Sequence, residues 1–172
     1  MSGNKEYSSW HKSVLRILSM SPHAVALLRG GATYPKITGI VRFYQTEKGV
    51  LVATEVSGLP EEGDACANSV FAIHIHGGSS CQGHASEPFA EAMGHYNPEN
   101  CPHPYHAGDM PPLFANEGYA FAVFLTDRFK VDEIMKKTVI IHSKPDDFTS
   151  QPAGNSGEKI ACGVIHAGIR KP

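Results

Sequence analysis

Histidines gather in one segment of this chain, and imidazole nitrogens are frequent ligands of transition metals. Of the ten histidines in the 172 residues, six lie between residues 73 and 110. The segment contains the motifs "HIH", "GHYNP" and "HPYHAGD", which supply His74, His76, His95, His103, His106 and Asp109. Nitrogen and oxygen donors at this density predict a metal site.

The spacing within the motifs suits coordination. On a strand, His74 and His76 would lie on the same side, with Cα atoms roughly 7 Å apart. The alternative is that both are polar residues on a solvent-exposed face. His103, His106 and Asp109 follow one another at spacings of three. With one more histidine they complete the tetrahedral set that zinc prefers.

Two donor sets can be counted when one histidine is shared. His142 ends the apolar run "TVIIH", far from the other histidines in sequence. The first set is His74, His76, His95 and His142. The second set is His95, His103, His106 and Asp109. The sequence therefore predicts two ions that share His95.

Short runs typical of β-strands must position these donors. From residue 24 they are rich in Val, Ile, Phe and Ala, and Gly, Pro, Asn or Asp separates them. The runs are "AVALLRG", "ITGIVRFYQT", "GVLVATEVSGL", "VFAIHIH", "YAFAVFLTD", "TVIIHS" and "IACGVIHAG". "EKG" at 47–49 and "NEG" at 116–118 are typical of turns between neighbouring strands. About seven or eight strands predict an all-β sandwich or barrel.

Long loops are predicted at 77–116 and 143–159, and the first contains most of the donors. Loops longer than about 12 to 15 residues without secondary structure are usually functional or disordered. Histidines, cysteines and prolines in the first loop favour function.

Composition narrows the class of protein. The length indicates one domain, and a net charge of -2 provides no basic surface for a nucleic-acid partner. No apolar run is long enough to span a membrane. The first 23 residues lack the apolar core of a signal peptide, which predicts a cytoplasmic protein, or an extracytoplasmic one if an upstream signal was removed. We expect residues 1–23 to be an extension, with a short amphipathic helix over 9–20, and residues 24–172 to form the domain.

The cysteines are Cys66, Cys81, Cys101 and Cys162, which lie far apart and form no C-x-x-C pair. A cysteine zinc finger is therefore not indicated. Disulfides remain open, and four cysteines allow three full pairings.

The motifs "FAIHIH", "GHYNP", "HPYHAGD", "TVIIHSKPDD" and "GNSGEKIACGVI" occur in the order and roughly the spacing of the copper/zinc superoxide dismutases. The chain resembles this family over about residues 24–168. The resemblance implies a Greek-key β-barrel with long metal-binding and electrostatic loops, copper on the first donor set, zinc on the second, and a disulfide between Cys81 and Cys162. It also implies that Asp146 accepts hydrogen bonds from one copper ligand and one zinc ligand; the alternative is a turn aspartate after Pro145.

The activity implied by the resemblance is dismutation of superoxide, with copper cycling between two oxidation states, zinc fixing the loop, and His95 supplying a proton. The alternative is a non-catalytic zinc- or copper-binding protein on the same barrel. A homodimer is compatible with the sequence.

One residue departs from the family pattern. Lys159 stands where the family usually has an arginine beside copper, which keeps the charge and loses the forked donor geometry. We expect Lys159 to guide superoxide; the alternative is a solvated loop lysine. Cys66 and Cys101 match no family disulfide, so they pair with each other or remain thiols. We expect His11, His23, His84 and His166 to be surface residues, and Phe89, Tyr96, Phe114 and Tyr119 to pack under the long loop.

Overall fold

Antiparallel pairing joins the strands of this protein into one sheet. The computed structural model describes residues 14–61 and 69–168. The elements in these ranges are β1 (Ala24–Gly30), β2 (Thr38–Thr46), β3 (Gly49–Ser57), β4 (Val70–Phe71), β5 (Ile73–His76), η1 (Ala90–Ala92, a 3-10 helix), β6 (Leu113–Asn116), β7 (Tyr119–Thr126), β8 (Thr138–His142) and β9 (Lys159–Ala167). Their order in the sheet is β4-β6-β7-β3-β2-β1-β9-β8-β5.

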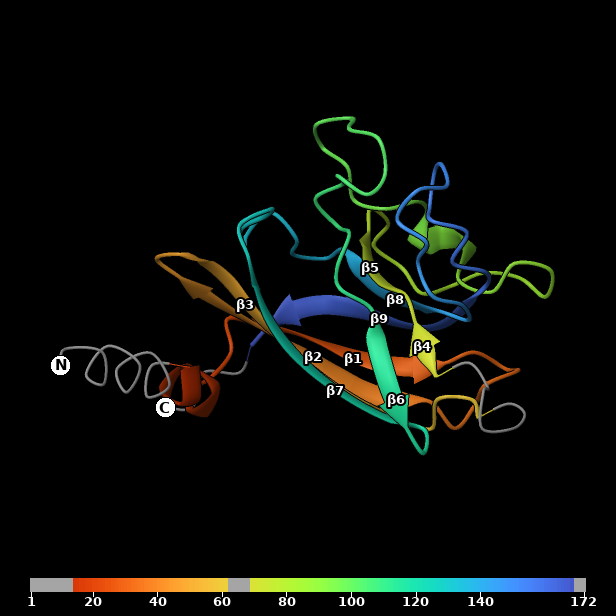
Figure 1. Cartoon of the computed structure of the whole chain (residues 1–172), viewed down its shortest axis with the longest axis horizontal. Coiled ribbons are helices and arrows are strands. Elements are labelled where there is room, and N and C mark those ends of the chain that lie inside the picture. The colour runs from red at the N-terminus through yellow and green to blue at the C-terminus, as the bar shows by residue number, and fades with distance from the viewer. Residues whose placement is uncertain (1–13, 62–68, 169–172) are drawn as a thin grey trace, which may run out of the picture.

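The two edge strands of the sheet, β4 and β5, belong to one short segment of chain. β4 pairs with β6 and β5 pairs with β8, although only Ala72 separates β4 from β5. Residues 70–76 therefore close the sheet into a barrel (Figure 1). The all-β barrel of about eight antiparallel strands is confirmed. The described residues form nine strands, because Ala72 divides one predicted run and residues 113–116 pair as β6 inside the predicted loop.

Alternation along the strands fills the barrel with apolar side chains. Val41 and Phe43 of β2, Val50 and Val52 of β3, and Ile165 of β9 are fully buried and belong to one cluster. Residues two apart on a strand face the same side, so these form the inner face.

The two predicted turns are present. Thr46 pairs with Gly49 across the first turn, and Asn116 pairs with Tyr119 across the second. Glu117 and Gly118, between β6 and β7, have φ of 49° and 71°. Two central residues with positive φ are what a tight two-residue hairpin requires.

The outer face of the barrel is partly apolar. Residues 14–19 form a helix. An outer cluster contains Val14, Ile17, Leu18, Tyr44, Leu51, Ala53 and Val123. Within the described residues, no helix is both long and apolar enough to cross a membrane.

Two of the four aromatic residues expected under the long loop lie elsewhere. Phe114 on β6 and Tyr119 on β7 are exposed, so that prediction is wrong for them. Both are members of strands, where alternation directs every second side chain away from the core. Phe89 and Tyr96 are packed against apolar clusters.

Both long loops lie on one side of the barrel. Residues 77–112 and 143–158 run above β5 and β8 (Figure 1). The Cys81–Cys162 disulfide, with 5.7 Å between Cα atoms, ties the first loop to β9 and is confirmed. Phe89, Ala92 and Ile140 pack around it. The loop over the donors is therefore anchored to the barrel covalently and by apolar contacts.

Candidate metal centre

β5 presents two histidines on the outer side of the barrel. Ile73 and Ile75 point into the core, so His74 and His76 lie on the opposite face. Both imidazoles are nevertheless buried, at 0% and 1% exposure, because the long loops cover them. The alternative of polar residues on a solvent-exposed face is therefore wrong.

A third histidine comes from the neighbouring strand. His142 is the last residue of β8, where the register with β9 shifts between Ile141 and His142. Such an irregularity can re-aim a side chain. His142 Nε2 lies 3.2 Å from His76 Nε2. Residues 66 positions apart thus bring their ring nitrogens together.

The first loop supplies the remaining donors by running along β5. Isolated bridges join His76 to His95 and His74 to Asp109, and Ile75 N–H donates to the Gly108 carbonyl at 2.9 Å. Gly108 passes so close that a Cβ there would collide with the Ile75 carbonyl oxygen. Glycine at this position therefore allows the loop to reach β5.

The donors form two groups that share one residue. In each group the candidate ligand atoms all lie within 4.8 Å of one another. The first group is His74, His76, His95 and His142, and the second is His95, His103, His106 and Asp109. These are the two predicted donor sets.

His76 and His142 each use Nδ1 in a hydrogen bond, which leaves Nε2 of each ring free. His76 Nδ1 lies 2.7 Å from the Met93 carbonyl, and His142 Nδ1 lies 3.4 Å from the Gly157 carbonyl. A carbonyl only accepts, so each Nδ1 carries the proton and each Nε2 has a lone pair. Two lone pairs facing each other at 3.2 Å suit a cation that both could bind.

Asp146 fixes one histidine from each group. Its carboxylate accepts from His74 Nε2 at 2.8 Å and from His103 Nε2 at 2.9 Å. This leaves Nδ1 of both rings as acceptors, and both are buried without a hydrogen bond, as is His95 Nε2. Unpaired buried nitrogen is costly unless something binds it. These orphaned atoms fit ligands of metal ions.

Asp109 completes the second group. Its Oδ1 accepts from His95 Nδ1 at 2.7 Å and lies 3.4 Å from His106 Nδ1. His103 Nδ1 lies 3.1 Å from Asp109 Oδ2, but the two atoms lack hydrogen-bond geometry. The lone pair of His103 Nδ1 is therefore free to bind a metal ion. Three imidazoles and one carboxylate make a set of the kind that zinc binds.

The pKa shifts of several residues at this site favour cation binding at neutral pH. Burial lowers the pKa of His74, of His76 and, to about 3, of His142. Burial alone would raise the pKa of Asp146, but hydrogen bonds from His74, the Phe148 N–H and His103 outweigh it and hold this pKa at about 2. Neutral imidazoles beside ionised carboxylates are the forms that coordinate metals.

Lys159 lies beside the first group. It is the register partner of His142 at the start of β9. Its Nζ donates to the Phe89 carbonyl at 3.3 Å and lies 3.5 Å from Glu87 Oε1. Lys159 has a side chain only 15% exposed, whereas Glu87 is 59% exposed. Sequence reasoning missed Glu87, because the pair spans 72 positions without a local pattern.

The remaining histidines lie outside the two groups. His23, His84 and His166 are exposed, as predicted, and His11 lies outside the described residues. Tyr96 packs beneath Lys137, whose Nζ lies 4.3 Å from the ring centroid.

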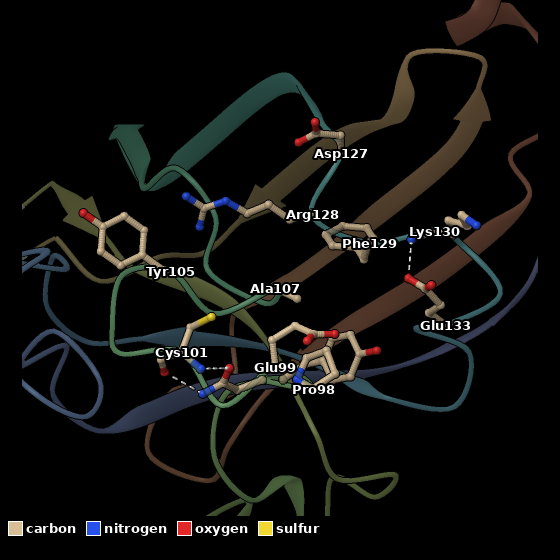
Figure 2. Close-up of a pocket in the computed structure, with 12 residues that line it drawn as sticks. Pro98, Glu99, Cys101, Tyr105, Ala107, Asp127, Arg128, Phe129, Lys130 and Glu133 are labelled. Atoms are coloured by element: carbon tan, nitrogen blue, oxygen red, sulfur yellow. Dashed lines mark hydrogen bonds between the residues drawn. The ribbon is translucent and has the colours of Figure 1, made fainter.

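A cavity of about 430 Å³ lies beside the second group, and Cys101 lines it as a free thiol. Cys66, for which a pair with Cys101 was one of two alternatives, lies outside the described residues. Figure 2 shows Cys101, Tyr105 and Arg128 around this cavity. Arg128 Nη1 donates to the carbonyls of Pro104 at 2.9 Å and His106 at 3.4 Å. Sequence patterns do not predict these two hydrogen bonds, because their acceptors are backbone atoms.

Comparison with known proteins identifies the family. A family model described as copper/zinc superoxide dismutase matches residues 37–165. The Cu-Zn superoxide dismutase 2 of Aquifex aeolicus is 33% identical over 148 residues, which cover 77% of this chain and 81% of the relative. The Cu-Zn enzyme of Legionella pneumophila is 34% identical over 139 residues, covering 76% and 79%.

A solved structure shares the fold. The Cu/Zn superoxide dismutase from Brucella abortus superposes with a TM-score of 0.70 at 24% identity, covering 83% of this chain and 99% of that one. Residues 37–165, which the family model matches, include both donor groups and Cys81 and Cys162. The chain therefore belongs to the copper/zinc superoxide dismutase family, whose cofactors are copper and zinc.

Proposed function

We propose that this chain is a superoxide dismutase that holds one copper and one zinc ion. The observation that carries the proposal is the pair of buried donor groups joined through His95. Four imidazoles suit an ion that alternates between Cu(II) and Cu(I), whereas three imidazoles and a carboxylate suit zinc. We therefore assign copper to the first group, His74, His76, His95 and His142. Zinc is assigned to the second group, His95, His103, His106 and Asp109.

The reaction converts two superoxide anions and two protons into oxygen and hydrogen peroxide. When bound, copper supplies the one-electron exchange with superoxide, and zinc adds fixed positive charge. His95 Nε2, buried without a hydrogen-bond partner, is the atom that we expect to hold a proton for the product. Asp146 keeps His74 and His103 in one orientation by accepting from both rings.

Lys159 is the proposed guide for superoxide. The Phe89 carbonyl holds its ammonium in place near His142, and a fixed cation at the site raises the local concentration of a small anion. Glu87 lies 3.5 Å away and offsets part of that charge. The association rate should therefore depend on both residues.

A homodimer belongs to the same proposal. Phe114, Tyr119, Phe121 and Leu125 are exposed on the neighbouring strands β6 and β7. Apolar side chains gathered on one face often mark a protein contact. Sedimentation velocity should find a dimer that Phe121→Glu dissociates; a monomer at all concentrations would remove this part of the proposal.

The test of function is metal analysis after loading with copper and zinc, combined with an assay of superoxide consumption. We expect both metals to be retained and superoxide to be consumed at a rate far above that of the metal-free chain. Retention of both metals without consumption would leave the alternative, a non-catalytic metal-binding protein on this barrel.

A further inference from the structure

The side chain of Gln151 contacts the backbone of His103 at two points. The His103 N–H donates to Gln151 Oε1 at 3.0 Å, and Gln151 Nε2 donates to the His103 carbonyl at 2.7 Å. The carboxamide thus pairs with both polar backbone groups of one residue, as a neighbouring strand would. The two residues are 48 positions apart and belong to different loops.

The sequence around His103 explains why a side chain provides this pairing. His103 lies between Pro102 and Pro104, and proline has no N–H to donate to a ladder. An ordinary strand could not continue through this stretch. Gln151 satisfies the backbone of His103 where the prolines prevent regular pairing.

Backbone hydrogen bonds hold the loop that carries Gln151 in a tight turn. Asp147 N–H donates to the Gly154 carbonyl at 2.9 Å, and Gly154 N–H donates to the Ser150 carbonyl at 2.8 Å. Gly154 has φ of 65°, and a Cβ there would collide with the Asp146 carboxylate. The turn therefore closes tightly against Asp146, with Gln151 within it.

His103 is consequently held by this loop at three points. Gln151 holds the backbone, and Asp146 accepts from ring Nε2 at 2.9 Å. We propose that Gln151 is a positioning residue for the zinc site, which fixes the His103 backbone so that ring Nδ1 faces the other zinc donors. This inference rests on the assignment of zinc to the second group under the proposed function.

The test is Gln151→Met, which keeps the length of the side chain and removes both hydrogen bonds, with Gln151→Ala as a second variant. Partners of metal-bound histidines typically contribute 10- to 100-fold in metal affinity. We expect zinc to pass to a competing chelator about 10-fold more readily from both variants. The visible spectrum of the protein with Co(II) at the zinc site should also change. Gln82→Met, which alters an exposed glutamine of the other loop, is the control and should behave as the parent.

Unfolding of the metal-free variants distinguishes positioning from general stabilisation. Unchanged zinc transfer and an unchanged Co(II) spectrum would overturn the inference, as would a lower melting temperature without a zinc-specific effect. Neither metal readout uses superoxide, so loss of the proposed activity in the parent and failure of this inference are separate results.

Discussion

The two donor groups occupy one buried cluster but are built by different means. The first group, to which we assign copper, takes three of its four histidines from strands β5 and β8, where sheet register places them. The second group, to which we assign zinc, takes all of its members from the loop at 77–112. Two of the strand donors, His76 and His142, have their tautomers fixed by backbone carbonyls alone, whereas His74 donates to Asp146. Loop donors depend on side chains from elsewhere, including Asp146, Gln151 and Arg128.

We therefore expect the first group to keep its geometry wherever the barrel is folded, and the second group to respond to changes in the loops. His95 is the exception, because it comes from the loop and belongs to both groups.

His95→Ala should have the largest effect, because it removes one of four donors from each group. We expect dismutase activity to fall by at least about 100-fold, beyond the range seen for mere partners of ligands, with weakened zinc retention in the same protein. His166→Ala, at an exposed position on β9, is the control. If His95→Ala kept its zinc and its activity, the shared-ligand assignment would be wrong.

Breaking the disulfide should loosen the loop from the barrel. Cys81 and Cys162 are 81 positions apart, and closing a loop of that length contributes roughly 4 kcal/mol in the chain-entropy model. The double variant Cys81→Ser/Cys162→Ser should lose up to about this free energy of unfolding in urea titrations. Cys101→Ser, which changes a free thiol, should lose little. Equal losses in the two proteins would show that the disulfide does not stabilise the fold.

Acid should destabilise the metal-free protein because His142, a donor on strand β8, is buried in its neutral form. The folded pKa of His142 is about 3, against 6.5 for an ordinary histidine. As pH falls below about 6.5 the unfolded chain binds a proton that the folded chain refuses, so stability is lost with falling pH. Between pH 7.5 and 5 this amounts to about 2 kcal/mol for His142.

Urea unfolding of the metal-free parent and of His142→Gln, at both pH values, measures this effect. The variant should lose about 2 kcal/mol less than the parent between the two pH values. The same loss in both proteins would mean that His142 is not buried in its neutral form.

The smallest effect should come from the charges above the site. Lys159→Ala should lower the second-order rate several-fold and flatten its dependence on ionic strength, because salt screens a steering charge. Lys159→Arg should preserve the rate or raise it. Glu87→Gln should raise the rate and steepen the salt dependence. Stopped-flow decay of superoxide on fully loaded protein measures all three, and an unchanged rate and salt slope in Lys159→Ala would exclude a guiding role.

Much of the fold was predictable because local patterns specify it. The seven apolar runs lie in strands, and the turns at 47–49 and 116–118 are hairpins. β6 escaped prediction because it has four residues, of which only Leu113 is buried. Phe114 was misplaced for a related reason, because a residue assigned to a loop has no predicted inward or outward face. Tyr119 begins the predicted run "YAFAVFLTD", whose first seven residues are all apolar or aromatic, so their pattern does not indicate which side faces the core.

The donor residues were predictable from their types and from the family resemblance, and so was the role of Asp146, whereas the other supporting side chains were not. His74, His76 and His142 lie in recognisable strands. Gln151 and Arg128 act on backbone atoms 48 and 24 residues away, and Glu87 meets Lys159 across 72. Such contacts depend on how two loops meet in space and leave no periodicity in the sequence.

Closure of the barrel by residues 70–76 has a consequence for self-association. These few residues cover β6 on one side and β8 on the other, and they also carry His74 and His76. An unpaired strand edge is a template for pairing with another chain. Any condition that detaches this segment would uncover two such edges at once, one on each side of the opening. Because the closing segment carries His74 and His76, which we assign to copper, we expect that a bound ion also helps to protect the protein against intermolecular β-sheet formation.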